Sequence, residues 1–176
     1  MLRWEKLMEL ARGEPKEESR EITRLKRRCA EGEADHGEML ELARHYLRSK
    51  NKMQCEELLA GLIADEGIGE SVLRDICAIL ENIGSYELAF DGYEKLHALN
   101  PALALPVYLM GRLCELQGDF EKAIALHRKA IEIEPDNPEC YYRLGVAYTK
   151  SHLYEEAEEQ YRAAIALDPT HSKSYT

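Results

Sequence analysis

The sequence holds few of the residues that mark a disulfide framework, a metal site or a membrane span. Its five cysteines are an odd number, lie far apart and include no CxxC pair, which argues against a zinc site and against paired disulfides. No run approaches the roughly 20 apolar residues that a membrane-spanning helix needs, and the charged N-terminus has no signal-peptide core. We therefore expect five buried structural thiols in a reduced, cytoplasmic protein without membrane insertion.

Positive charge is also scarce. Lys and Arg number 23 against 33 Asp and Glu, so the formal net charge is −10, and a polyanion such as nucleic acid would meet net repulsion. The hydrophobic fraction of 45% is typical of a folded domain and too high for a disordered chain. We expect a globular protein that does not bind nucleic acid.

Motifs of enzymatic chemistry are missing. The sequence contains no phosphate-binding loop with Lys-Ser/Thr, no HExxH and no GxSxG. Of the six histidines, His127 is expected in the core in place of an aromatic residue, and the others fall late in helices, near turns or on exposed faces. We therefore expect no enzyme activity, no catalytic residue, no metal ligand and no cofactor.

What the sequence does contain is a period of 34 residues. Prolines recur at Pro101, Pro135 and Pro169, after the same small or apolar pattern. Pairs of identical residues recur at this offset without a gap, namely Gly111 and Gly145, Ala123 and Ala157, Ala130 and Ala164, Ile131 and Ile165, Arg128 and Arg162, and Tyr108 and Tyr142. A fixed period of this length indicates a repeat architecture.

Within one period the apolar spacing is helical. It predicts one helix over Pro138 to Lys150 and a second over Tyr154 to Leu167, with "SHLY" between them. The proline past the second helix cannot continue it, so that helix ends at a fixed place. Small residues at the Gly111 and Ala123 positions would let the two helices cross closely, and such thin pairs must stack on one another.

These residues resemble the tetratricopeptide repeat (TPR) family. The family pattern is met in the last copy by Tyr141, Leu144, Gly145, Tyr148, Ala157, Tyr161 and Pro169. Earlier copies match more loosely, with Cys77 in the glycine column and Gly67 in place of a proline. The resemblance implies an all-α fold, a right-handed superhelical solenoid of stacked antiparallel helix pairs, and a peptide-binding groove.

The predicted organisation follows from this register. It comprises a divergent N-terminal helical hairpin (1–35, with helices over Leu2 to Arg12 and Pro15 to Ala30), a degenerate repeat (36–69), three TPR-like repeats (70–103, 104–137 and 138–171) and the start of a further helix or a tail (172–176). Tyr175 falls in the first aromatic column of another copy. The chain is therefore expected to be an excised piece of a longer repeat protein, or to end in a short tail.

Two charged runs have a structural interpretation. Glu155, Glu156, Glu158 and Glu159 resemble a cation site, but we expect them on the solvated side of a helix whose other side holds Ala157. The basic run from Arg24 to Arg28 follows an acidic turn and is typical of a helix C-terminus.

In stacked helix pairs, the first helix of each pair lines the concave surface. The positions there that flank the apolar columns form a cationic and aromatic strip in an acidic chain, and the candidate peptide-binding residues are Arg44, Arg48, Arg74, Tyr108, Arg112, Tyr142, Arg143 and Lys150. Arginine pairs with carboxylates through two parallel hydrogen bonds. The alternative is that these arginines pair with neighbouring glutamates of the chain itself.

Three functions stay open. The first is a non-catalytic scaffold that binds an acidic or C-terminal peptide segment of a partner protein in its groove. The second is a structural subunit that self-associates through its C-terminal end, where Tyr148, Tyr161 and Ile165 are expected to be partly uncovered. The third is the regulatory repeat arm of a longer enzyme. The sequence does not identify the partner, the organism, the pathway or the oligomeric state.

Overall fold

The computed structural model describes residues 20–169 and contains nine α-helices and no strand in that range. The chain forms two compact units, Met1–Leu62 and Ile63–Thr176. Each described part has apolar clusters of its own. The predicted helix over Leu2 to Arg12 and the Tyr175 register position lie outside the described residues.

The first unit contains α2 (Arg20–Glu31), α3 (His36–Arg48) and most of α4 (Lys52–Ala64). Ile22 and Leu25 of α2 pack with Leu42 of α3 in one apolar cluster. A capping box starts α3, because the Asp35 side chain accepts from the Glu38 backbone N–H while the Glu38 carboxylate accepts from the Asp35 backbone N–H. Helix α2 overlaps the predicted helix over Pro15 to Ala30 and ends one residue later, at Glu31.

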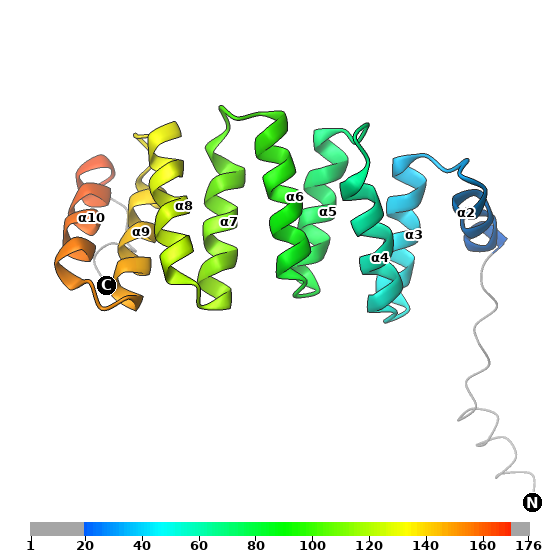
Figure 1. The fold of residues 1–176 in the computed structure, drawn as a ribbon, viewed down its shortest axis with the longest axis horizontal. Coiled ribbons are helices and arrows are strands. Elements are labelled where there is room, and N and C mark those ends of the chain that lie inside the picture. The colour runs from blue at the N-terminus through cyan, green and yellow to red at the C-terminus, as the bar shows by residue number, and fades with distance from the viewer. Residues whose placement is uncertain (1–19, 170–176) are drawn as a thin grey trace, which may run out of the picture. The chain divides into compact units, whose positions relative to one another are not determined.

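The second unit is a row of helix pairs (Figure 1). The pairs are α5 (Glu70–Asn82) with α6 (Tyr86–Leu99), α7 (Ala104–Gln117) with α8 (Phe120–Ile133), and α9 (Pro138–Lys150) with α10 (Tyr154–Leu167). Each helix contacts its partner, and α6 contacts α7 as α8 contacts α9. The helices predicted for the last pair are confirmed at both ends.

Glycine sets the distance between paired helices. A Cβ atom at Gly111 would lie 2.5 Å from the His127 ring, and one at Gly145 would lie 2.6 Å from the Tyr161 ring. In the α5–α6 pair the glycine column holds Cys77, and the glycine is on the other helix, at Gly92. A Cβ atom at Gly92 would lie 2.6 Å from the Cys77 Sγ. Each pair therefore has one residue without a side chain where the helices cross.

The turn within each pair contains one left-handed residue at a fixed position. Gly84 and Gly118 have φ values of 73° and 81°, and Lys50 and His152 have φ values of 58° and 62°. These four positions are successive multiples of 34 residues apart. Glycine adopts this conformation without strain, whereas lysine and histidine adopt it at a cost.

Four of the five cysteines are buried, and Cys29 is only partly buried, so the expectation of five buried thiols is wrong for Cys29. Burial raises the pKa of the Cys77 thiol to about 12 and that of Cys140 to about 11, with nearby glutamates adding to the effect. These thiols therefore stay protonated at neutral pH and serve as core side chains.

Candidate functional site

The eight predicted site residues are divided between the two units. Arg44 and Arg48 lie one turn apart on α3 of the first unit, and both are exposed. The other six lie on the first helices of the pairs in the second unit, which are α5, α7 and α9. We call the exposed side of these three helices the first-helix face.

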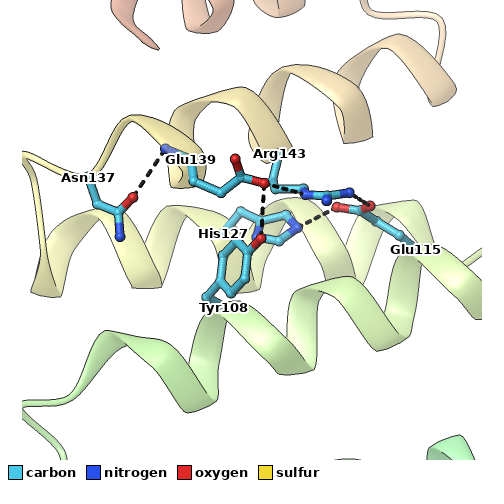
Figure 2. Close-up of polar contacts among 6 residues, drawn as sticks. All are labelled: Tyr108, Glu115, His127, Asn137, Glu139 and Arg143. Atoms are coloured by element: carbon cyan, nitrogen blue, oxygen red, sulfur yellow. Dashed lines mark hydrogen bonds and ion pairs between the residues drawn. The ribbon is translucent and has the colours of Figure 1, made fainter. Parts of the chain in front are cut away.

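Arg143 is held by two carboxylates of the chain itself (Figure 2). Its Nε lies 3.1 Å from Glu139 Oε1 on the same helix, and its Nη1 lies 3.5 Å from Glu115 Oε2 on α7. The Tyr108 hydroxyl donates to Glu139 Oε1 at 3.2 Å. Arg143 thus connects α9 to α7, and for this residue the pairing with neighbouring glutamates is what the structure shows.

The electrostatics of this network agree with its geometry. Burial acts to lower the pKa of the Arg143 guanidinium, but Tyr108, Glu115 and Glu139 together raise that pKa above its ordinary value. Burial, and then the negative charge of Glu139, raises the pKa of the Tyr108 phenol. Arg143 stays charged and Tyr108 stays protonated, so both hydrogen bonds persist over the physiological pH range.

Glu115 also contacts a buried histidine. His127 is fully buried, its Nε2 lies 2.6 Å from Glu115 Oε1, and its ring packs against Tyr108 with centroids 5.9 Å apart. The core position expected for His127 is confirmed. The contact also has a counterpart in the repeat pattern, because Glu115 and His127 occupy the same repeat positions as Glu81 and Tyr93.

That equivalent contact exists in the neighbouring pair. The Tyr93 hydroxyl donates to Glu81 Oε1 at 2.6 Å, and in the last pair the hydroxyls of Tyr161 and Thr149 are 3.1 Å apart. A polar bond between the two helices therefore recurs at one repeat position in all three pairs of the second unit. These residues were not among the predicted site residues.

Arg112 differs from Arg143. It is half-buried on α7 and makes no hydrogen bond or ion pair with any residue in 20–169. Burial raises the pKa of the Tyr93 phenol, and the positive charge of Arg112 partly opposes that rise. Arg112 therefore presents a cation whose carboxylate partner is not supplied by the described part of the chain.

Two exposed leucines lie on either side of Arg112. Leu105 is 50% exposed and Leu116 is 59% exposed. With Tyr108 and Arg112 they are spaced by three, four and four residues, which places all four on one face of α7. In the other pairs of this unit the equivalents of these leucines are polar, with Ser71 and Glu139 for the first and Asn82 and Lys150 for the second. Leu105 and Leu116 were not among the predicted site residues, although this contrast is visible in the sequence.

The remaining predicted residues are less distinctive. Arg74 pairs with Glu70 at 3.0 Å on an exposed helix surface, a type of pair that contributes little. Tyr142 packs against Tyr161, with ring centroids 5.8 Å apart. Lys150 is exposed at the end of α9.

A small cavity of about 120 Å³ lies between α7 and the start of α9. Its lining comes from both helices and from the connection between α8 and α9, and consists of Ala104, Leu105, Tyr108, Glu134, Asn137, Glu139 and Cys140. Beside it lies Asn137, the N-cap of α9, whose Oδ1 accepts from the Glu139 backbone N–H at 3.1 Å. The first-helix face thus has a hollow next to Tyr108.

Two other expectations can be compared with the structure. The four glutamates of α10 are exposed, as predicted. Tyr148 was expected to be partly uncovered if no helix followed Tyr175, but it is buried, with 4% of its surface exposed, and its hydroxyl accepts a hydrogen bond from Arg128. Tyr161 and Ile165 are partly buried.

Over residues 20–169 no three His, Cys, Asp or Glu side chains are grouped as a metal site would require. None of the helices in this range combines the length and the apolar character that a membrane crossing requires.

Comparison with known proteins places this geometry in a family. A "TPR repeat" model matches residues 111–151, and a "Tetratricopeptide repeat" model matches residues 138–171. The bovine (Bos taurus) BBSome complex member BBS4 is 34% identical over 70 residues, which are 40% of this chain and 14% of that protein. The chain therefore spans only a small part of this curated relative.

Solved structures share the fold. A crystal structure of MamA protein superposes with a TM-score of 0.63 at 22% identity, over 86% of this chain and 83% of that one. The first TPR of Spaghetti (RPAP3), bound to the HSP90 peptide SRMEEVD, superposes with a TM-score of 0.57 at 21% identity, over 60% of this chain and 84% of that one.

The fold class predicted from the sequence, an all-α solenoid of helical repeats, is therefore confirmed. The two repeat models together cover residues 111–171. The helix pairs, their recurring close crossings and these matches identify residues 111–171 as tetratricopeptide repeats.

Proposed function

We propose that this chain is a non-catalytic module that binds a peptide segment of a partner protein on its first-helix face. The observation that carries the proposal is the surface of α7, where the exposed Leu105 and Leu116 frame Arg112. Apolar side chains exposed beside a cation without a carboxylate partner are typical of interaction surfaces. The rigid helix pairs would present these side chains already ordered, which lowers the entropic cost of binding.

We further propose that the bound segment is acidic or ends in a free carboxylate. Arg112 would pair with that carboxylate, while Arg74 and Lys150 would add exposed positive charge on α5 and α9. Arg143 and Tyr142 would act by holding the surface in shape, since they already contact Glu115, Glu139 and Tyr161. Tyr108 would border the hollow beside α9 that could receive an apolar side chain.

Similar proteins support the class of ligand. The RPAP3 structure is described as bound to the peptide SRMEEVD, which has acidic residues and ends in Asp. This likeness is one of fold, so the chemistry must come from the residues of this chain. Arg44 and Arg48 on α3 remain a separate prediction for the first unit.

The proposal is tested by binding of a fluorescent SRMEEVD peptide, measured by anisotropy. We expect Arg112→Glu to weaken binding at least roughly tenfold, because it replaces a charge-assisted hydrogen bond by repulsion. The matched control is Arg162→Glu on α10, which makes the same change in net charge at an exposed residue that pairs with Glu158. Equal affinities for Arg112→Glu and the unchanged protein would contradict the proposal.

Self-association is a second candidate with an observation of its own. Leu153, Tyr154 and Leu167 at the ends of α10 are 41%, 61% and 41% exposed. Sedimentation equilibrium of the full chain decides this candidate. A mass that stays monomeric over a wide concentration range would rule it out.

A further inference from the structure

A second hollow of the molecule lies away from α7's exposed leucines, between the second helices of the last two pairs. It is a groove of about 410 Å³ between α8 and α10, with α9 beneath it. Its lining is Arg128, Ile131, Glu132, Tyr141, Leu144, Tyr148, Glu156, Glu159 and Gln160. We call it the α8–α10 groove.

The bottom of the groove is apolar. Leu144 and Tyr148 of α9 are 3% and 4% exposed and form one apolar cluster with Ala157, against which Ile131 packs. Tyr141, one turn before Leu144, is half-buried. An occupant can therefore bury apolar side chains against this surface, which favours binding by removing both surfaces from water.

The walls of the groove are acidic. Glu132 on α8 faces Glu156 and Glu159 on α10 across it, and none of the three has an ion-pair partner among residues 20–169. Glu158, which does not line the groove, has such a partner, because Arg162 lies 2.6 Å from its carboxylate. Of the three α10 glutamates without an ion-pair partner among residues 20–169, two therefore line the groove, and the third, Glu155, lies outside its lining.

The one cation in the lining does not neutralise these walls. The Arg128 guanidinium donates a hydrogen bond to the Tyr148 hydroxyl, and its central carbon lies 5.7 Å from the centre of the Tyr148 ring. Arg128 is therefore engaged with an aromatic side chain. Three glutamates and one arginine leave the lining with two net negative charges.

The acidic walls are not required by the packing of helix pairs. One repeat earlier, the positions of Glu132, Glu156 and Glu159 are occupied by Ala98, Lys122 and Ala125. Those residues belong to helices that pack in the same way, on the same period. The carboxylate walls of the α8–α10 groove are therefore absent at the equivalent positions of α6 and α8.

We propose that the α8–α10 groove binds an amphipathic segment of a partner protein that carries lysine or arginine beside apolar residues. The glutamates of the walls would pair with lysine or arginine side chains of the segment. The apolar bottom would contact an apolar side chain that lies between those cations in the segment. A groove of this volume suits the side chains of a short peptide segment. This site is separate from the first-helix face, and its occupant has the opposite charge, so one module would hold two different segments.

The test uses the full chain and two synthetic probes. One is an amphipathic helix built from leucine and lysine, and the other is the same peptide with glutamate in place of every lysine. Isothermal titration calorimetry at physiological salt should show binding of the lysine peptide, whereas any binding of the glutamate peptide should depend on Arg112 and not on the groove glutamates. Failure of the lysine peptide to bind overturns the proposal.

Matched double variants locate the site. Glu156→Gln with Glu159→Gln removes two charges from the groove wall, whereas Glu155→Gln with Glu158→Gln removes the same charge from the same helix outside the groove lining. We expect the first variant to weaken binding roughly three- to tenfold and the second to change it less than twofold. Equal effects would mean general attraction to an acidic surface and would overturn the proposal.

The same experiment separates this site from the proposed peptide-binding face. Arg112→Glu lies on α7 and should leave the affinity for the lysine peptide unchanged within twofold. If Arg112→Glu strengthens lysine-peptide binding markedly while the groove variants do nothing, the peptide occupies the first-helix face and the α8–α10 groove is not its site.

Discussion

The contact between Gly111 and His127 determines how closely α7 and α8 approach. The His127 ring occupies the space where a Cβ at Gly111 would lie, and the same relation holds for Gly145 and Tyr161. His127 is held in turn by Glu115. One side chain therefore links the spacing of a helix pair to the charge network around Arg143.

Substitution of Gly111 tests this role against an ordinary helical glycine. Gly111→Ala should lower the free energy of unfolding by about 1–3 kcal/mol, because the added methyl group overpacks the crossing. Gly61→Ala should raise it by about 0.5–1 kcal/mol, because Gly61 lies within α4 and an added Cβ would meet no atom within 4 Å outside the adjoining backbone of its own helix. Urea denaturation followed by circular dichroism measures both. Destabilisation of the same size at both positions would contradict the crossing argument.

At the scale of single helices, the start of the second helix differs between pairs. Asp119 caps α8, because its side chain accepts from the Lys122 backbone N–H at 3.1 Å. Thirty-four residues later the same position before α10 is occupied by Leu153, which gives no side-chain cap. The two helices are of equal length, so they form a natural comparison of capped and uncapped starts.

Exchanging these cap residues should move stability in opposite directions. Asp119→Ala should cost about 1 kcal/mol, since one backbone N–H of α8 loses its acceptor. Leu153→Asp should gain up to about 1 kcal/mol, since it supplies the missing acceptor and its side chain is 41% exposed. Thermal unfolding of both variants provides the measurement. A loss of stability in Leu153→Asp would show that the leucine packs more strongly than its exposure indicates.

The helices were predictable from the sequence because the spacing of apolar residues and the position of proline determine helix bounds within a short stretch of chain. Both helices of the last pair begin and end where the apolar spacing and Pro169 placed them. The charge pairing was less predictable. Glu139 lies four residues before Arg143 on one helix, which spacing does suggest, but Glu115 lies on another helix, and its reach to Arg143 depends on how α7 and α9 pack.

The exposed side of α7 was likewise only partly predictable from the sequence. The columns of the repeat identified Tyr108 and Arg112, because they recur beside the apolar positions. They did not identify Leu105 and Leu116, since a leucine on a helix is usually assigned to the core and only its exposure shows otherwise. Which arginine is paired and which lacks a partner likewise follows from tertiary packing rather than from residue type.

At the scale of the whole second unit, stability should be local, because contacts connect mainly neighbouring helices. Leu144→Ala removes a buried side chain from α9 and should cost about 2–5 kcal/mol in that region. We expect faster amide hydrogen exchange in α8, α9 and α10, with exchange in α5 and α6 nearly unchanged. Hydrogen-exchange mass spectrometry makes the comparison. A uniform increase across α5 to α10 would show that the unit unfolds as one.

The left-handed turn residue at every thirty-fourth position has a consequence for how such a molecule can grow. Since Gly84, Gly118 and His152 reverse the chain at the same point of each period, a tandem duplication of residues 104–137 would join in phase at both ends. The added segment would bring its own Arg112 and its own pair of exposed leucines. Gene duplication could thus lengthen the proposed peptide-binding face by whole repeats, without a change in any existing turn.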